Sequence, residues 1–254
     1  TSLFGIYGAT ESLPITKVES REVFALEEKT RNGAGICLGK PIEGVTVRII
    51  PITDEPIQEW QDSLIVKSNV VGEFTVQSGA TTRGYIHRED ADRLSKIHRH
   101  CEEGARPDEA ISGLEHEIAS GEEQERPRND GVDFIHRMGD VGYFDEEGRL
   151  WYCGRKSHRL QTQDGVMFTE QIENIFNAHP QVFRTALVGV NGEPVLWVEL
   201  EKHVRGNKDK IRDQLMDMAA FHPQASKISS FLFTKKFPTD VRHNSKNIRE
   251  ALTS

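Results

Sequence analysis

The sequence has 254 residues, of which 36% are hydrophobic and 28% are charged, and its formal net charge is -8. This length supports one large domain or two smaller ones, and the acidic balance argues against nucleic acid as a partner because phosphate recognition needs a basic face. No apolar run is long enough to span a bilayer, and the three cysteines, Cys37, Cys101 and Cys153, are widely spaced. We therefore expect reduced thiols in a cytoplasmic protein without a transmembrane segment.

The first 85 residues predict short strands separated by turns. The apolar run at residues 3–7 is typical of a buried strand, and Gly8 directly after it indicates a ligand loop. The Gly-rich segment 31–44 predicts backbone that turns often or lies close to another part of the chain. Further strands are predicted at residues 45–49, 63–68 and 72–77.

Residues from about 90 to 130 form a charged insertion with few large apolar side chains. Residues 91–97 could form one short helix with an apolar face, and residues 111–118 could form another. Metal-ligating residue types gather at residues 98–101, but they lack a second ligand pair, so we expect a solvated surface there. The whole segment is predicted to be a surface insertion.

Strands return near residue 132, and beyond Ser157 the pattern changes to alternating helices and strands. Thr169 and Asn207 are predicted to cap helices, and Asn191-Gly192 is a strong hairpin signal. Strands are expected at residues 142–144, 150–153, 183–190, 195–200 and 230–234, with a turn at 145–148 and a last short helix at 246–252. The change of pattern predicts two domains, residues 1–156 and 157–254.

Four stretches of this sequence, in their order and spacing, resemble the back half of the adenylate-forming superfamily, which includes acyl-CoA synthetases, luciferase and peptide-synthetase adenylation domains. The stretches are Tyr7-Gly-Ala-Thr-Glu11, Gly72-Glu73 with Gly84-Tyr85, Gly139-Asp140 with Gly154-Arg155, and Lys246 with Arg249. The resemblance covers nearly the whole chain except the insertion. It implies a mixed α/β and α+β fold, in which a strand-rich, β-barrel-like end of the large domain precedes a small mobile α+β domain.

The resemblance also implies a site for ATP and Mg²⁺. The ring of Tyr7 would stack on adenine, with Gly8 and Ala9 beside the nucleotide and the Thr10 hydroxyl on a phosphate oxygen. Glu11 would bind the Mg²⁺ that bridges the phosphates. The alternatives are an ordinary core tyrosine at position 7 and a solvated loop acid at position 11.

Asp140 and Arg155 would hold the ribose, the alternative being a salt bridge within a hairpin. Lys246 would stabilise the charge that develops between the carboxylate and the α-phosphate, although a lysine in a C-terminal helix is more often a solvated surface residue. Ser157 occupies the hinge position, where the superfamily commonly has Asp or Lys. Ser245 stands where a Gly usually precedes the lysine.

The sequence around these motifs looks like that of the β-lactone synthetases of bacterial long-chain olefin biosynthesis, a subgroup understood to use no CoA. This resemblance implies that a 2-alkyl-3-hydroxy fatty acid is activated as acyl-AMP and closed to a β-lactone by its own hydroxyl, because tethering supplies proximity. A fatty acyl-CoA ligase or an acyl-AMP ligase is the alternative. Other enzymes of the olefin pathway are implied as partners, and the insertion could contact them.

A hypothesis of a different class is a non-catalytic fragment. The chain begins with an apolar segment and no Met, and no Gly-rich phosphate loop precedes Tyr7. We therefore expect that the phosphate loop and the acyl pocket lie upstream of residue 1, and that the 254 residues alone are catalytically incomplete.

Overall fold

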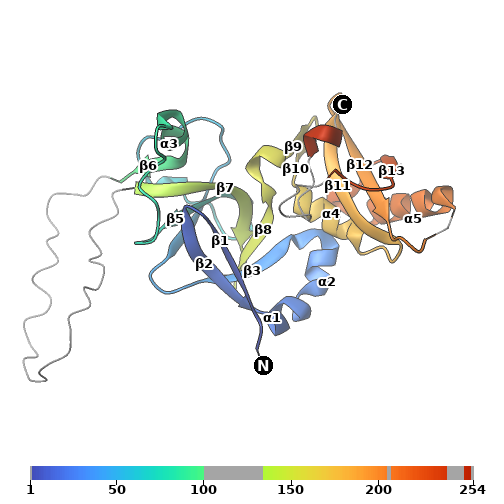
Figure 1. The fold of residues 1–254 in the computed structure, drawn as a ribbon, viewed down its shortest axis with the longest axis horizontal. Coiled ribbons are helices and arrows are strands. Elements are labelled where there is room, and N and C mark those ends of the chain that lie inside the picture. Colours follow the sequence, from blue (N-terminus) through green and yellow to red (C-terminus); the bar gives the residue numbers. More distant parts are fainter. Residues whose placement is uncertain (1, 100–133, 205–206, 239–248, 253–254) are drawn as a thin grey trace, which may run out of the picture.

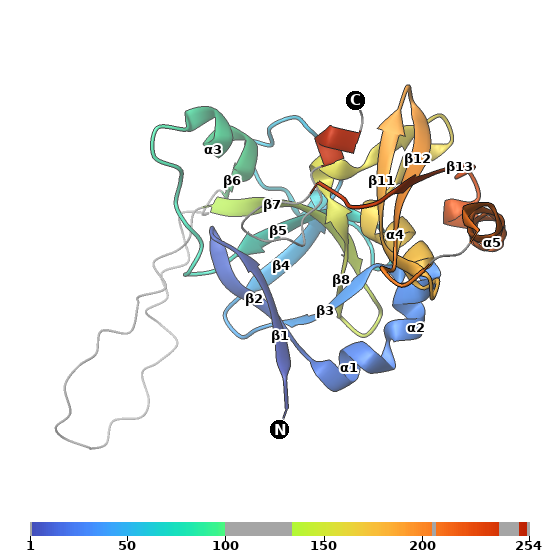
Figure 2. The same cartoon turned by 45° about the vertical axis from the view of Figure 1, so that its right-hand side comes forward.

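The computed structural model describes residues 2–99, 134–204, 207–238 and 249–252. Two parts lie side by side in Figures 1 and 2: a strand-rich first part up to residue 155, and a C-terminal part from residue 156 onward, in which helices pack on a smaller sheet. Each part has its own hydrophobic cluster. This arrangement agrees with a boundary at 156–157, which stays a prediction.

The first part is built on an eight-stranded sheet in the order β1-β2-β3-β8-β7-β5-β4, with β6 paired to β7. The strands are β1 (Phe4–Ala9), β2 (Ser12–Glu19), β3 (Ile36–Pro41), β4 (Thr46–Ile50), β5 (Gly72–Gln77), β6 (Lys96–His98), β7 (Phe134–Phe144) and β8 (Leu150–Arg155). The short helices are α1 (Ser20–Ala25), α2 (Glu27–Lys29) and α3 (Glu89–Ser95). The mixed, strand-rich fold class is confirmed. The sheet formed by the described residues does not close into a barrel, so the expected barrel-like subdomain is observed only as an open, strand-rich sheet.

Several local predictions for the first part need correction. The expected strand at 63–68 is wrong, because Asp62–Leu64 forms one 3₁₀ turn and residues 65–67 have no regular structure. Strand β1 forms as predicted but is not buried: Phe4 and Ile6 are 45% and 63% exposed. The reason is its place at the edge of the sheet, where it pairs with β2 alone.

The insertion is described only at its borders. Helix α3 begins at Glu89 and ends at Ser95, so the helix expected over 91–97 lies two residues earlier in the chain, and Ile97 lies in β6. Residues 100–133, including the helix expected at 111–118, lie outside the described residues.

The hairpin predicted around residues 145–148 is confirmed, since β7 and β8 are antiparallel and the Gly148 N–H donates to the Asp145 carbonyl at 3.1 Å.

A buried ion network crosses the middle of the first part. Glu73 on β5 is 1% exposed and accepts from the Arg137 guanidinium of β7 at 2.6 Å, while the Lys156 ammonium lies 3.1 Å from its other oxygen. Arg137 also donates to the carbonyls of Thr53 and Glu55. Since a buried charge is tolerated only when it is paired and hydrogen-bonded, this network fixes β5, β7 and the segment after β8 relative to one another.

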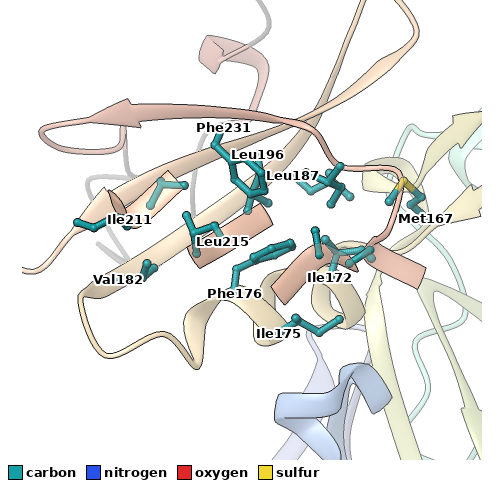
Figure 3. Close-up of a cluster of buried hydrophobic side chains, with 14 residues drawn as sticks. Met167, Ile172, Ile175, Phe176, Val182, Leu187, Leu196, Ile211, Leu215 and Phe231 are labelled. Carbon is teal, nitrogen blue, oxygen red and sulfur yellow. The ribbon is translucent and has the colours of Figure 1, made fainter. Parts of the chain in front are cut away.

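The C-terminal part packs two helices on one face of a three-stranded sheet, in the order β11-β12-β13. Its elements are β9 (Leu160–Thr162), β10 (Gly165–Met167), α4 (Thr169–Asn177), β11 (Val182–Val190), β12 (Glu193–Leu200), α5 (Lys208–Phe221), β13 (Ser230–Thr234) and the 3₁₀ turn η6 (Arg249–Leu252). Figure 3 shows Phe176 and Ile172 of α4 pointing toward Leu187 and Leu196 of the sheet, with Leu215 of α5 beside them. Burial of these apolar side chains is the main source of stability for this part.

Most predicted elements of the C-terminal part are confirmed. The hairpin at Asn191-Gly192 has positive φ at both residues, 53° and 83°, as a two-residue turn of the favoured type requires. Asn207 caps α5, because its side chain accepts from the Asp209 N–H. The cap predicted at Thr169 is wrong: the helix begins at Thr169 itself, and Phe168 precedes it without a side-chain cap.

Two glycines mark where the parts touch. A Cβ atom at Gly154 would lie 2.4 Å from Thr169 Oγ1, and one at Gly33 would lie 2.1 Å from Gln224 Nε2. Gln224 also donates to the carbonyl of Asn32 at 3.0 Å. At Gly33 the nearest atom belongs to a flexible side chain, but a Cβ atom there would also lie 3.0 Å from the Gln171 carbonyl oxygen of α4. The Gly-rich segment therefore lies close to another part of the chain, as predicted. None of the helices in the described ranges has the length and apolarity to cross a membrane.

Candidate functional site

The tip of the β1–β2 hairpin presents Thr10 and Glu11. Strand β1 ends at Ala9, which pairs with Ser12 at the start of β2, so the two residues form the turn between the strands. Gly8 is required here, because a Cβ atom at this position would lie 2.8 Å from the Ser12 carbonyl oxygen. Thr10 is exposed and Glu11 is half-buried, so the turn offers one hydroxyl and one carboxylate to a ligand.

A buried group of hydroxyls holds this turn in place. Ser12, Ser78 and Thr81 lie within 3.0–3.3 Å of one another through their side-chain oxygens. The Thr82 N–H also donates to the Glu11 carbonyl at 2.7 Å. The segment after β5 therefore fixes the backbone of the turn that carries Glu11.

The carboxylate of Glu11 has a specific partner, Tyr85, whose hydroxyl donates to Oε1 at 2.7 Å. Burial acts to raise the pKa of Glu11, but this hydrogen bond, together with the nearby His136 and Lys96, holds the pKa below its ordinary value. Burial and the Glu11 carboxylate raise the pKa of Tyr85 to about 12, so its hydroxyl stays a donor. Glu11 is therefore an ionised, oriented carboxylate at neutral pH.

Asp140 and Arg155 face each other across the β7–β8 pair. The Asp140 carboxylate lies 3.1 Å from Arg155 Nη1 and accepts from the Tyr7 hydroxyl at 2.6 Å. Asp140 is 4% exposed, whereas the Arg155 side chain is 47% exposed. The hairpin salt bridge considered as the alternative is thus observed, and the ribose-binding role of the pair stays a prediction.

Tyr7 lies at the edge of the first part's core. Its ring meets that of Phe74 edge-on at a centroid distance of 6.0 Å, and burial, reinforced by Asp140, raises the pKa of its hydroxyl. The ring is only half-buried. Core packing and a hydrogen bond to Asp140 therefore fix the ring, and its stacking on adenine stays a prediction.

One cavity lies between the hairpin tip, which carries Thr10 and Glu11, and Arg155 of β8. A space of about 480 Å³ is bordered by residues of the hairpin tip and of β7 and β8. Its lining includes Gly8, Ala9, Thr10, Glu11, Leu13, Tyr85, His136, Arg137, Met138 and Arg155. The structure thus gathers around one hollow the residues predicted at positions 8–11 and 155. Two larger hollows lie elsewhere on the surface, one beside α3 and one beside α2.

Of the predicted site residues, Tyr7, Asp140 and Ser157 are not among those that line the cavity. Ser157 is exposed in the 3₁₀ turn Lys156–His158 that follows β8, between the anchored side chains of Lys156 and Arg159. Lys246 lies outside the described residues, as does Ser245. The catalytic and hinge roles of Lys246 and Ser157 stay predictions.

The sequence did not identify His136 and Lys96 as site residues, although both lie near enough to Glu11 to lower its pKa. The His136 ring lies 3.1 Å from the Ser95 carbonyl through Nδ1, and burial, together with the charge of Lys96, lowers the pKa of His136 to about 4. Lys96 is 7% exposed and donates to the Thr82 carbonyl. No motif marks these positions, because their meeting depends on the pairing of β6 with β7.

The donor set fits a metal that is held mainly by its substrate. Within the described ranges, no group of three or more His, Cys, Asp or Glu residues is placed to hold a metal ion. Mg²⁺ keeps several waters and is commonly held by one or two carboxylates plus phosphate oxygens. Glu11 alone therefore fits such an ion if phosphates supply further oxygens. Cys37 and Cys153 are free and buried, in agreement with reduced, packed thiols.

The sequence is similar to curated proteins over almost its whole length, although no protein-family model matches it. It is 43% identical over 251 residues to a protein named olefin beta-lactone synthetase from Xanthomonas campestris, and 38% identical over 252 residues to one of the same name from Stenotrophomonas maltophilia. Each match covers 97% of this chain and 40% of the relative. The chain therefore spans about two fifths of the length of these relatives.

Solved structures share the fold. The amide bond synthetase McbA from Marinactinospora thermotolerans superposes with a TM-score of 0.65 at 20% identity, over 98% of this chain and 41% of that protein. The o-succinylbenzoate CoA synthetase MenE from Bacillus subtilis, in complex with AMP, gives a TM-score of 0.65 at 18% identity, over 100% of this chain and 41% of that protein. Both likenesses concern the same arrangement of a strand-rich part and a small C-terminal part.

Proposed function

Since this chain belongs to the adenylate-forming family of the proteins named olefin beta-lactone synthetase, we propose that it carries the nucleotide side of an ATP-dependent carboxylate-activating site. One observation supports this most directly: Glu11 lines the same cavity as Arg155, whose guanidinium pairs with Asp140. A carboxylate suited to Mg²⁺ and an arginine suited to a ribose thus line one hollow, and Asp140 pairs with that arginine. MenE from Bacillus subtilis has been solved with ATP and magnesium ion, which supports both ligands.

In the proposed reaction, an oxygen of the substrate carboxylate attacks the α-phosphorus of ATP, and pyrophosphate leaves with the bonding electron pair. Mg²⁺, when bound by Glu11 and the phosphates, would supply charge neutralisation. Tyr85 keeps the Glu11 carboxylate ionised and oriented. Asp140 and Arg155 orient the sugar. Lys246 places a cation at the developing negative charge, and one such group contributes about 3 kcal/mol to transition-state stabilisation at similar sites.

We further propose that the product is a β-lactone. The support is the 43% and 38% identity to two proteins that bear the name olefin beta-lactone synthetase. The substrate would be a 2-alkyl-3-hydroxy fatty acid. Its β-hydroxyl oxygen attacks the acyl carbon of the acyl-AMP and loses its proton, while AMP leaves with the electron pair of the broken C–O bond. No second substrate is needed, because nucleophile and electrophile are tethered.

The alternative is a ligase in which the thiol of CoA performs the second step. It is supported by 28% identity over 133 residues to a 2-succinylbenzoate–CoA ligase of Bacillus cytotoxicus, a match that covers 52% of this chain. Incubation with ATP and the β-hydroxy acid, with and without CoA, separates the two. Formation of AMP and lactone without CoA supports the synthetase, whereas strict dependence on CoA contradicts it.

The site assignment is tested by ATP–pyrophosphate exchange in the polypeptide that contains these 254 residues. Lys246→Ala and Glu11→Gln should each lower the exchange rate by about 10²-fold or more. Lys227→Ala is the matched control, since Lys227 is 61% exposed in the C-terminal part and pairs with the exposed Asp164. Unchanged exchange in Glu11→Gln would contradict the metal role of Glu11.

A hypothesis of a different class is that this chain alone is a non-catalytic fragment. We propose that residues 1–254 in isolation bind nucleotide without catalysing exchange, because the expected phosphate loop is not among them. Exchange by the isolated chain would contradict this proposal. A cytoplasmic location and association with other olefin-pathway enzymes are also proposals. Co-purification with such enzymes, before and after deletion of residues 99–128, tests whether the insertion mediates contact, and unchanged co-purification would contradict it.

A further inference from the structure

Residues 82–85 lie between β5 and α3 and carry part of the candidate site, yet they belong to no helix or strand. Tyr85 lines the cavity and donates to the Glu11 carboxylate at 2.7 Å, and the Thr82 N–H donates to the Glu11 carbonyl at 2.7 Å. This short segment therefore holds Glu11 by both its side chain and its backbone. Because the segment lies outside the sheets, its own position depends on the contacts that neighbouring elements make with it.

Asp92 of α3 holds one end of this segment. Its Oδ1 accepts from the Tyr85 backbone N–H at 2.9 Å, and Asp92 is half-buried. The carboxylate also lies against the backbone of Gly84, where an added Cβ atom would come within 2.9 Å of Oδ2. A hydrogen bond from a backbone N–H to an ionised acceptor is stronger than one to a neutral acceptor. Asp92 therefore fixes the backbone from which the Tyr85 side chain extends to Glu11.

Lys96 of β6 holds the other end of the segment. Its ammonium donates to the Thr82 carbonyl and lies 4.8 Å from the centre of the Phe134 ring. Lys96 is only 7% exposed, and burial of an ammonium is costly unless an acceptor compensates for the lost water. Two consecutive hydrogen bonds thus connect Lys96 through the Thr82 backbone to the backbone of Glu11.

Both anchoring residues are supported by β7, which also borders the cavity. Strand β6 pairs with β7, with Lys96 opposite His136, and α3 contacts the same strand. Figure 1 shows α3 and β6 together beside β7. The β1–β2 hairpin that carries Glu11 lies at the edge of the sheet, separated from β7 by β3 and β8. The segment 82–85 therefore connects the hairpin tip directly to the strand on the other side of the cavity.

We propose that Asp92 and Lys96 are positioning residues, which hold the segment 82–85 and thereby keep the Glu11 carboxylate in the orientation that Mg²⁺ requires. The inference rests on the proposed metal role of Glu11. It adds that the affinity for Mg²⁺ depends on two residues of α3 and β6 that are not among those lining the cavity. Hydrogen bonds that orient a metal-ligating side chain typically change metal affinity or activity by about 10–100-fold.

The first test measures the Mg²⁺ concentration that gives half-maximal ATP–pyrophosphate exchange in the polypeptide that contains these residues. Asp92→Ala removes the acceptor, and Lys96→Met removes the donor but keeps a long unbranched side chain. Each should raise this concentration by about 10–100-fold, with an exchange rate at saturating Mg²⁺ within about twofold of the wild type. Arg93→Ala is the matched control, because Arg93 follows Asp92 on α3 and its side chain is 66% exposed. It should leave the Mg²⁺ dependence unchanged.

The second test measures binding without turnover, by calorimetric titration in the absence of the acid substrate. Asp92→Ala and Lys96→Met should weaken the binding of ATP with Mg²⁺ by about tenfold or more. They should leave the binding of AMP without metal within about twofold, because AMP does not need the metal-binding carboxylate. Asp92→Asn keeps an acceptor oxygen for the Tyr85 N–H, so it should recover most of the affinity that Asp92→Ala loses.

A double variant shows whether Lys96 acts through Glu11. Glu11→Gln/Lys96→Met should then bind ATP with Mg²⁺ no more weakly than Glu11→Gln alone, whereas independent effects would add in free energy. Independent effects, equal losses for ATP and AMP, Asp92→Asn as weak as Asp92→Ala, or an unchanged Mg²⁺ dependence in Asp92→Ala and Lys96→Met overturn the inference while the proposed function stands. An unchanged Mg²⁺ dependence in Glu11→Gln overturns the metal role of Glu11 and the inference with it.

Discussion

The two parts of the molecule have interiors of different kinds. The first part buries Glu73 between two cations, Arg137 and Lys156, in the middle of its sheet. The C-terminal part also buries a charged pair, Glu173 with Arg249, but its largest interior cluster consists of fourteen buried hydrophobic residues (Figure 3). A charged interior fixes directions, because each hydrogen bond has one geometry, whereas an apolar interior mainly fixes volume. The part that borders the cavity is the one whose interior fixes directions.

The comparison also predicts that the two parts fail differently. Removal of one partner from a buried ion pair leaves an uncompensated charge, and this penalty exceeds what the pair contributed. Removal of atoms from an apolar cluster leaves a cavity, and the loss depends on how far the neighbours relax. Substitutions in the two interiors test this difference.

Glu73→Ala should be the most damaging, because it leaves both Arg137 and Lys156 buried without their carboxylate. We expect the free energy of unfolding to fall by about 3–5 kcal/mol, measured by urea denaturation. Asp54→Ala is the control, since Asp54 is 67% exposed in its pair with Arg159, and it should cost less than about 1 kcal/mol. Equal effects of the two substitutions would show that burial of the network contributes little.

Leu215→Ala tests the apolar interior. Leu215 is fully buried on α5 within the main cluster, and its truncation should lower the free energy of unfolding by about 2–5 kcal/mol. Met216 is the matched neighbour, 45% exposed on the same helix, so Met216→Ala should change stability by less than about 1 kcal/mol. A small effect of Leu215→Ala would indicate that the cluster repacks and does not specify the C-terminal part.

Elements with strong local signals could be predicted from the sequence. The hairpin at Asn191-Gly192 and the cap at Asn207 follow from local conformational preferences, and both are confirmed. The apolar face of α4 follows from helical periodicity. Strand β1 was predicted, but its exposure was not, because edge and centre positions depend on the order of strands in the sheet.

The site could be predicted only as a set of separate motifs. Positions 7–11, 140 and 155 were found by resemblance, yet the hydrogen bond from Tyr85 to Glu11 joins segments 74 residues apart. The placement of His136 behind Glu11 depends on β6–β7 pairing, and the Glu173–Arg249 pair joins residues 76 apart. Local patterns carry no information on such contacts, since distant side chains meet only through packing and register.

Acid should destabilise the first part of the molecule through His136. Burial, with the Lys96 charge, lowers its pKa from 6.5 to about 4, so the folded state binds a proton less readily than the unfolded state. The stability that this difference contributes is complete above pH 6.5 and is lost as the pH falls toward 4. The loss should be about 2–3 kcal/mol. Urea denaturation of the wild type and of His136→Asn across this range checks it; an unchanged slope in the variant would exclude His136 as the cause.

Glu170, beside Glu173 in the first turn of α4, should give a smaller effect of the opposite sign. Burial, with the charge of Glu173, raises the pKa of Glu170 to about 7 from an ordinary 4.5. Between these values the folded state keeps a proton that the unfolded state has lost, so stability falls as the pH rises from 4.5 to 7. Glu170→Gln, which is neutral at every pH, should therefore stabilise the protein by about 1–3 kcal/mol near pH 8 and change little near pH 4.5.

The control for Glu170→Gln is Glu193→Gln, because Glu193 is exposed at the start of β12. Its substitution should leave the free energy of unfolding nearly unchanged at both pH values. If Glu170→Gln destabilises near pH 8, then the ionised carboxylate contributes favourably, through Arg249, more than its burial opposes. The charged groups of α4 would then stabilise the C-terminal part in the way that Glu73 and its cations stabilise the first part. The two parts would differ only in the apolar cluster of the C-terminal part.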